Sequence, residues 1–155
     1  MLEVWIDGAC EPINPKGTAS YGLVIKHNGI VLFREGKVIG KGEGYSNNVA
    51  EYSGLIAFLK WCENNGYLTH EDFEAQEYEK ALIQSDSQLL INQMTHMWQV
   101  NKGMYVPYWN QASELISHLG IENKLFYRWI PREQNQEADD LSKQALIAVG
   151  IKPRH

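Results

Sequence analysis

The stretch Leu2-Glu3-Val4-Trp5-Ile6-Asp7-Gly8 decides the fold. Val4, Trp5 and Ile6 form a continuous apolar run, which is typical of a central strand covered on both faces. Asp7 is expected where this strand leaves the core, and Gly8 would let the backbone turn away without a Cβ clash. A carboxylate at a strand end is held by a rigid element, which suits a metal ion or a catalytic water. An Asp at a strand end is usually an ordinary turn residue, so this stretch alone leaves both interpretations open.

The composition of the 155-residue chain is that of an ordinary globular protein, with 44% hydrophobic and 21% charged residues. We expect a single domain over residues 1–149 and a short C-terminal tail over residues 150–155. Because neither a membrane-spanning run nor a signal peptide is visible, we expect a cytoplasmic protein without membrane association, and a monomer is the default expectation. Cys10 and Cys62 match neither a disulfide framework nor a zinc spacing. The net charge of −5 argues against a general nucleic-acid coat protein, but it is compatible with a carboxylate-rich active site.

Turn signals and apolar periodicity predict a mixed α/β fold. We expect strands over residues 2–7, 18–27, 30–39, 81–86 and 125–130, and helices over residues 46–65, 88–97, 107–119 and 135–149. Asn28-Gly29 predicts a type I′ hairpin turn, and Ser46 and Asn135 are natural helix N-caps. The polar, acidic residues 67–80 predict a surface connection. Because the later strands need helical crossovers, we expect a five-stranded sheet, its first three strands antiparallel and its later two parallel to the first, flanked by helices.

Four carboxylates from separate elements are expected at one edge of this sheet. Asp7 and Asp86 would end neighbouring parallel strands, while helical periodicity puts Glu51 and Asp139 at the border of the core and Asp140 on the opposite side. Such like charges need divalent cations or shifted pKa values, and all-oxygen ligands favour Mg²⁺ or Mn²⁺ over zinc. Two such ions about 4 Å apart can activate water against a phosphodiester. The alternatives are a solvated acidic edge and acids that complement helix dipoles.

Four motifs carry a resemblance to a known family. They are Asp7-Gly8-Ala9, Ser46-Asn47-Asn48-Val49-Ala50-Glu51, Ser85-Asp86-Ser87-Gln88 and Asn135-Gln136-Glu137-Ala138-Asp139-Asp140-Leu141-Ser142. In this order, and over nearly the whole chain, they resemble type 1 ribonuclease H (RNase HI). The resemblance implies the RNase H-like fold and a metal-dependent endonuclease. Such an enzyme hydrolyses the RNA strand of RNA–DNA hybrids by two-metal-ion catalysis and leaves 5′-phosphate and 3′-hydroxyl ends.

The resemblance also implies a role for individual residues. The acids that would be both catalytic and metal-binding are Asp7, Glu51, Asp86 and Asp139. The positions that match hybrid-contacting residues are Cys10, Asn14, Asn47, Asn48 and Gln88. Amide side chains can exchange hydrogen bonds with 2′-hydroxyl groups, which distinguish RNA from DNA. Capping and turn formation are the alternative roles for the asparagines.

The chain departs from the well-known bacterial pattern in two places. A histidine in the loop before the last helix is missing, and the loop Pro131-Arg132-Glu133-Gln134 looks like the compact form seen in archaea and some bacteria. Arg132 is a candidate to contact the substrate phosphate in place of the missing histidine. His155 in the C-terminal tail is a second candidate. The basic extra helix that grips the DNA strand is also missing, since residues 98–105 hold Lys102 as their one basic residue.

Three alternatives stay open. The first is a metal nuclease of the same fold that acts on double-stranded RNA or branched DNA, because substrate choice depends on groove shape. The second is a hybrid-binding module without catalysis, which the presence of all four acids disfavours. The third is a non-catalytic Mg²⁺- or Ca²⁺-binding domain, disfavoured because no compact calcium loop is visible. We expect phosphate contacts from Lys16, Arg128, Arg132 and Lys143, so that binding weakens with salt.

Overall fold

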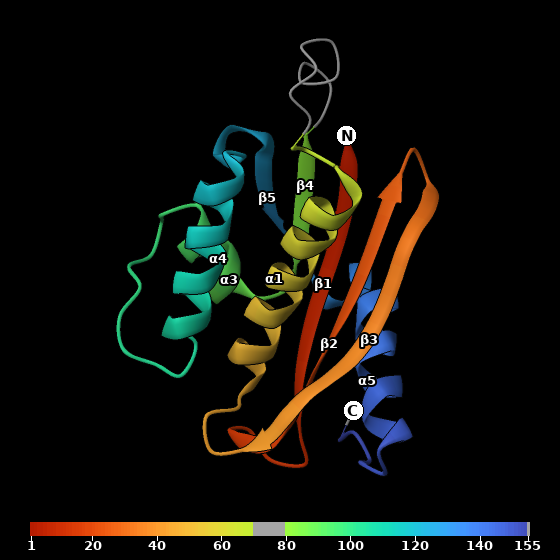
Figure 1. Ribbon diagram of the computed structural model, residues 1–155. Helices are drawn as coiled ribbons and strands as arrows, with labels where there is room; N and C mark the ends of the chain where they lie inside the picture. The colour runs from red at the N-terminus through yellow and green to blue at the C-terminus, as the bar shows by residue number, and fades with distance from the viewer. Residues whose placement is uncertain (70–79, 155) are drawn as a thin grey trace.

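Figure 1 presents a computed structural model of the chain, which describes residues 1–69 and 80–154. The strands are β1 (Leu2–Glu11), β2 (Lys16–His27), β3 (Ile30–Gly42), β4 (Ala81–Ser85) and β5 (Leu125–Trp129). They form one sheet in the order β3-β2-β1-β4-β5. β1 to β3 pair antiparallel, whereas β4 pairs parallel with both β1 and β5. The predicted mixed sheet, with β1 at its centre, is therefore confirmed.

β1 is longer than the sequence predicts. Its parallel pairing with β4 ends where Ile6 lies opposite Ser85, but its antiparallel pairing with β2 continues until Glu11 lies opposite Thr18. The prediction that the strand ends at Asp7 is wrong, because β2 goes on supplying backbone hydrogen bonds beyond that point. Asp7 is nevertheless the first residue of β1 beyond the reach of β4, so one side of the backbone opens there.

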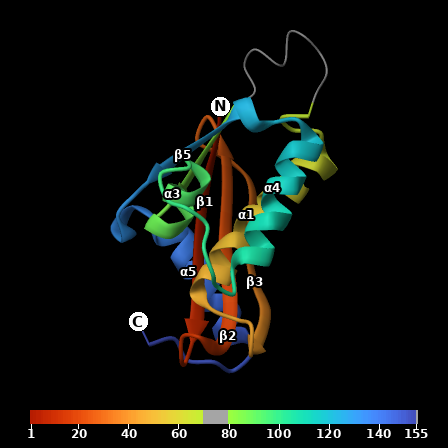
Figure 2. The ribbon, with the colours of Figure 1, turned by 90° about the vertical axis from the view of Figure 1, so that its left-hand side faces the viewer.

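Helices cover both faces of the sheet (Figures 1 and 2). They are α1 (Asn47–Asn65), α3 (Gln88–Met94), α4 (Val106–Leu119) and α5 (Gln136–Ala148). α1 packs on β1 and β2, with α4 beside it, whereas α5 packs on β1, β2 and β3. A Cβ atom on Gly22 would lie 1.8 Å from the carbonyl oxygen of Ala138, while the adjacent Tyr21 belongs to the core on the α1 side. Because successive strand residues face opposite ways, α1 and α5 lie on opposite faces.

Local signals in the sequence account for most element ends. Both residues of the Asn28-Gly29 turn have positive φ, at 51° and 78°, as a type I′ turn requires. The hydroxyl of Ser46 accepts a hydrogen bond from the Val49 amide at 3.2 Å, and Gly66 ends α1 in the left-handed conformation. The helix predicted over residues 88–97 is shorter and ends at Met94.

The core between the sheet and α1 fixes the strands that lead to the carboxylates. Val4 and Ile6 of β1 and Tyr52 of α1 are all completely buried there, and the ring of Tyr105 stacks on Tyr52 at 5.9 Å between centroids. Residues 70–79 of the predicted surface connection lie outside the described residues. Within the part of the chain that is described, no helix is both long enough and apolar enough to cross a membrane.

Candidate active site

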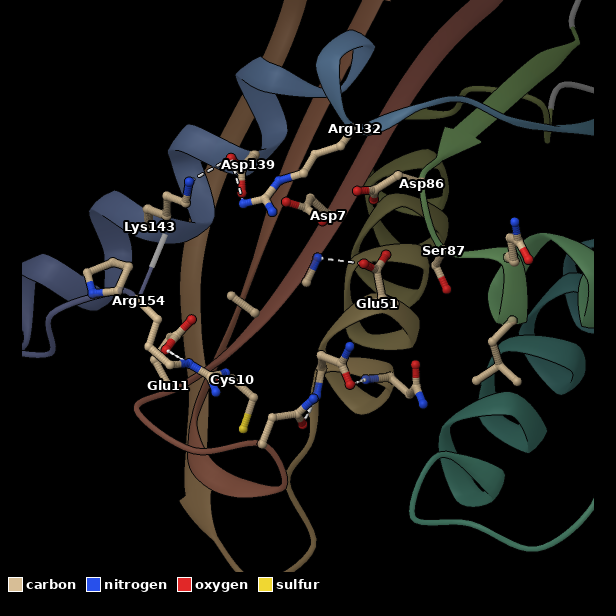
Figure 3. A pocket seen from close by; sticks show the side chains of 18 residues that line it. Asp7, Cys10, Glu11, Glu51, Asp86, Ser87, Arg132, Asp139, Lys143 and Arg154 are labelled. Atoms are coloured by element: carbon tan, nitrogen blue, oxygen red, sulfur yellow. Dashed lines mark hydrogen bonds and ion pairs between the residues drawn. The ribbon is translucent and has the colours of Figure 1, made fainter.

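Three carboxylates meet at the carboxyl end of β4 (Figure 3). Asp7 follows the last β1 residue that pairs with β4, Asp86 follows β4 directly, and Glu51 lies in the second turn of α1. One oxygen from each lies within 4.8 Å of the other two. We call Asp7, Glu51 and Asp86 the carboxylate cluster. Asp7 and Glu51 are buried, with 7% and 5% of their surfaces exposed, and Asp86 is half-buried.

Hydrogen bonds from two strands fix the orientation of Glu51. Its Oε1 accepts from the backbone amide of Gly8 at 2.8 Å, and its Oε2 accepts from the hydroxyl of Ser85 at 3.1 Å. Both carboxylate oxygens are thus held before any ligand arrives. This arrangement ties α1 to the ends of β1 and β4.

Gly8 is required because α1 approaches β1 very closely. A Cβ atom at this position would lie 2.6 Å from the backbone nitrogen of Glu51 and 2.8 Å from the carbonyl oxygen of Asn47. Gly8 lies inside β1, so the prediction that it turns the backbone away is wrong. Its small size instead lets the start of α1 bring Glu51 next to Asp7.

Asn135 connects the cluster to β1 across a large sequence separation. Its Nδ2 donates to the carbonyl oxygen of Ile6 at 2.8 Å and to Oδ1 of Asp86 at 3.4 Å. Asn135 precedes α5 as predicted, but its side chain makes no capping hydrogen bond. The indole nitrogen of Trp129 donates to the carbonyl oxygen of Asp86 at 3.1 Å. Two residues that follow β4 in the chain therefore position Asp86.

Asp139 lies in the same cleft but in a different electrostatic setting. It is 6% exposed, whereas its neighbour Asp140 is exposed, in agreement with helical periodicity. Its Oδ2 lies 2.9 Å from Nζ of Lys143 and 3.9 Å from Nη2 of Arg132. The fourth predicted acid is thus paired with cations, while the three members of the carboxylate cluster face one another.

The pKa values follow from these surroundings. Burial raises the pKa of Asp7, and the nearby charges of Glu51 and Asp86 raise it further. Burial and Asp86 also raise the pKa of Glu51, although the hydrogen bonds from Gly8 and Ser85 work in the opposite direction. Burial acts to raise the pKa of Asp139, but Lys143 and other neighbours hold it below its usual value. The cluster therefore holds more carboxylates than can all be ionised near neutral pH without a cation.

The carboxylates open into a cleft of about 410 Å³. The five positions that match hybrid-contacting residues of the family line it, and so does Arg132: Cys10, Asn14, Asn47, Asn48, Gln88 and Arg132. Oδ1 of Asn14 accepts from the Asn47 amide at 3.1 Å, and Oδ1 of Asn47 accepts from the Asn48 amide at 3.0 Å. These two oxygens accept from backbone amides at the start of α1, and the side-chain NH₂ groups of Asn14 and Asn47 can donate to a ligand.

Two of the four expected phosphate contacts lie elsewhere. Lys16 pairs with Glu43 at 3.4 Å, and Arg128 donates to Gln84. Neither lines the cleft, whereas Lys143 and Arg132 do. His155 lies outside the described residues.

Sequence reasoning did not single out two other residues that line the cleft, Glu11 and Arg154. Their side chains meet there from opposite ends of the chain. Glu11 falls in a segment that the sequence predicts as a loop, and Arg154 falls in the tail. Neither position carries a periodicity or motif that could have revealed it.

Comparison with known proteins places this arrangement in a family. A family model described as reverse transcriptase-like matches residues 6–145. The N-terminal RNase H domain of Rv2228c from Mycobacterium tuberculosis, solved as a fusion with maltose-binding protein, is 30% identical with a TM-score of 0.76. The alignment covers 96% of this chain and 95% of that one. The chain belongs to the type 1 ribonuclease H family.

Two further relatives of this chain differ in the share of their own length that the alignment covers. LC11-RNase H1, solved in complex with an RNA/DNA hybrid, is 26% identical with a TM-score of 0.81, over 96% of this chain and 99% of that one. The bifunctional protein Rv2228c of Mycobacterium tuberculosis is 33% identical over 138 residues, which are 88% of this chain but 33% of the relative. The chain thus spans about a third of the length of that curated relative.

Proposed function

We propose that this chain is an endoribonuclease that hydrolyses the RNA strand of RNA–DNA hybrids by two-metal-ion catalysis, giving 5′-phosphate and 3′-hydroxyl ends. The observation that carries the proposal is the carboxylate cluster, three acids within 4.8 Å of one another at the floor of an open cleft. Membership of the ribonuclease H family supports it. The similar LC11-RNase H1 was solved in complex with an RNA/DNA hybrid, which supports this choice of substrate.

The chemistry of the cluster fits hard divalent cations. Every side chain in it offers carboxylate oxygen, which Mg²⁺ and Mn²⁺ prefer, and neither histidine nor cysteine belongs to it. The mutual repulsion that raises the pKa values of Asp7 and Glu51 is what a bound cation would relieve. Asp7, Glu51 and Asp86 would hold the ions, with Asp139 joining from α5. Bound ions would supply an activated water and stabilise charge on the leaving oxygen.

The residues around the cluster prepare it for this chemistry. Gly8 and Ser85 fix the carboxylate of Glu51, so its position costs no reorganisation when the substrate binds. Asn135 orients the carboxylate of Asp86 in the same way. The amides that line the cleft are suited to donate to 2′-hydroxyl groups and base edges of an RNA strand. Arg132, half-exposed beside Asp139, is placed to contact a phosphate.

A cleavage assay on four substrates tests the proposal. An end-labelled RNA–DNA hybrid, single-stranded RNA, double-stranded RNA and double-stranded DNA would each be incubated with Mg²⁺, Mn²⁺ or EDTA. We expect metal-dependent cuts in the RNA of the hybrid. We expect Asp86→Asn to slow them by about a hundredfold or more, because this variant removes a metal ligand.

Asp140→Asn is the matched control for this assay. It makes the same chemical change on the exposed side of α5, so its cleavage rate should equal that of the wild type. Cleavage of double-stranded RNA instead of the hybrid would keep the metal chemistry and replace the substrate. Binding of the hybrid without cleavage in either metal would refute the enzymatic proposal.

A further inference from the structure

The end of the chain forms one wall of the cleft. α5 ends at Ala148, and Gly150, with φ +82°, reverses the chain. The amide of Ile151 then donates to the carbonyl oxygen of Leu146 at 3.0 Å, which holds the reversed segment against the helix. Pro153 and Arg154 line the cleft, and Arg154 contacts Cys10 and Glu11, the last residues of β1 (Figure 3). The tail is therefore placed where a ligand of the cleft can touch it.

Two hydrogen bonds hold the guanidinium of Arg154. Its Nε donates to Oε2 of Glu11 at 2.6 Å, and its Nη2 donates to the carbonyl oxygen of Cys10 at 3.1 Å. Glu11 is 7% exposed, whereas the side chain of Arg154 is 49% exposed. A guanidinium carries five N–H groups, and these two bonds use two of them. Arg154 therefore presents further donors to the cleft from a fixed position.

Charge distinguishes Arg154 from the other cations of the cleft. The lining holds five carboxylates and three cations. Two of these cations, Arg132 and Lys143, form ion pairs with Asp139. Arg154 instead pairs with Glu11, which is not one of the proposed metal ligands. Its contact with Glu11 does not compete with a metal ion for a ligand. Once cations neutralise the acids, Arg154 can attract an anion at the Cys10–Glu11 end of the cleft.

We propose that Arg154, positioned by Glu11, forms a binding subsite for a backbone phosphate of the nucleic-acid strand that enters the cleft. The planar fork of arginine matches two phosphate oxygens, which favours a phosphodiester. This inference rests on the proposed function, because it takes a nucleic acid to be the occupant of the cleft. It adds a subsite that Asn47, Asn48 and Gln88 do not supply, since the tail lies beside Glu11 and the end of β1.

Salt dependence of binding separates this role from simple anchoring of the tail. A fluorescent RNA–DNA hybrid would be titrated with the full chain at several salt concentrations in Ca²⁺, a hard divalent cation that carboxylates bind, after a control has shown that Ca²⁺ supports no cleavage. We expect Arg154→Ala to weaken binding about three- to tenfold and to reduce the slope of log K against log salt by about 1. Arg154→Lys keeps the charge but loses the fork. It should keep the slope and show an intermediate affinity.

Arg34→Ala is the matched control. Arg34 is also about half-exposed and paired with a carboxylate, Glu137, but it lies outside the cleft lining. Its loss should change neither the affinity nor the slope. A melting curve of each variant shows whether it is folded, and Arg154→Lys keeps the test valid if Arg154→Ala unfolds.

The outcomes distinguish failure of the subsite from failure of the function. If the wild type cleaves the hybrid but Arg154→Ala keeps the wild-type slope and affinity, the subsite is wrong and the proposed function stands. If the wild type prefers another duplex, the same slopes are measured on that duplex, and an unchanged slope again refutes the subsite. If the wild type binds no nucleic acid, both proposals are wrong.

Discussion

Replacing Asp7 with asparagine should stabilise the metal-free protein. Asp7 is 7% exposed and lies within 4.8 Å of carboxylate oxygens of both Glu51 and Asp86. At that separation and an effective dielectric constant of about 20, each pair of charges repels by about 3.5 kcal/mol. Protonating one carboxyl avoids this repulsion, but near pH 7 it costs an acid of ordinary pKa about 4 kcal/mol. The destabilisation that the cluster causes therefore does not exceed the cost of protonating one carboxyl group, about 4 kcal/mol.

The expected gain in stability is smaller than this limit because the asparagine amide loses contacts that the carboxylate makes. We expect Asp7→Asn to add about 1–3 kcal/mol to the free energy of unfolding in EDTA near neutral pH. For a chain of this size that corresponds to a rise in melting temperature of about 3–10 °C. The gain should grow with pH. Burial and repulsion raise the folded-state pKa of Asp7, so the folded state keeps protons that the unfolded state loses, and wild-type stability falls as pH rises above about 4.

Thermal melts over this pH range, with and without Mg²⁺, test the reasoning. Saturating Mg²⁺ should stabilise the wild type more than the variant, because a ligand that binds the folded state adds stability in proportion to RT ln(1 + [L]/Kd). Asp140→Asn makes the same change on the exposed side of α5 and should stay within about 0.5 kcal/mol of the wild type. If Asp7→Asn melts at or below the wild-type temperature in EDTA above neutral pH, the carboxylates do not repel one another as argued.

Three further substitutions should separate the stability of the fold from the orientation of the carboxylates. Gly8→Ala places a Cβ atom 2.6 Å from the backbone nitrogen of Glu51, so we expect a loss of about 1–3 kcal/mol in urea unfolding, together with slower cleavage. Asn135→Ala leaves the carbonyl oxygen of Ile6 without its side-chain donor, so we expect about 1–3 kcal/mol of destabilisation and weaker Mg²⁺ binding by calorimetry. Ser46→Ala removes the N-cap of α1, so we expect about 1 kcal/mol of destabilisation by the same urea assay, with Mg²⁺ affinity unchanged.

Short-range signals explain what the sequence predicted well. The Asn28-Gly29 turn, the cap at Ser46 and the burial of Asp139 rather than Asp140 each depend on backbone geometry or helical period within a few residues. The order of strands and helices followed from the same signals, since parallel strands require crossovers. Such features are visible in one stretch of sequence at a time.

Long-range contacts explain what the sequence could not predict. The length of β1 depends on its pairing with β2, which continues to Glu11 after β4 has ended. Asn135 resembles an ordinary helix cap, yet its donor reaches Ile6, 129 positions earlier. Arg154 meets Glu11 across 143 positions. Each contact joins residues whose proximity exists only in the folded sheet, so no local pattern announces it.

The carboxylate cluster draws its members from distant parts of the chain, at Asp7, Glu51 and Asp86, and Asn135 braces it from further still. A ribosome releases these residues one after another, so the cluster is incomplete while the chain is being made. β4 must emerge and insert beside β1 before Asp86 meets Asp7. The carboxylate cluster can therefore form only after β4 has emerged, and its contact with Asn135 can form only later, when the residues that precede α5 have emerged. A nascent chain from which Asn135 has not yet emerged therefore lacks the hydrogen bond that orients the carboxylate of Asp86.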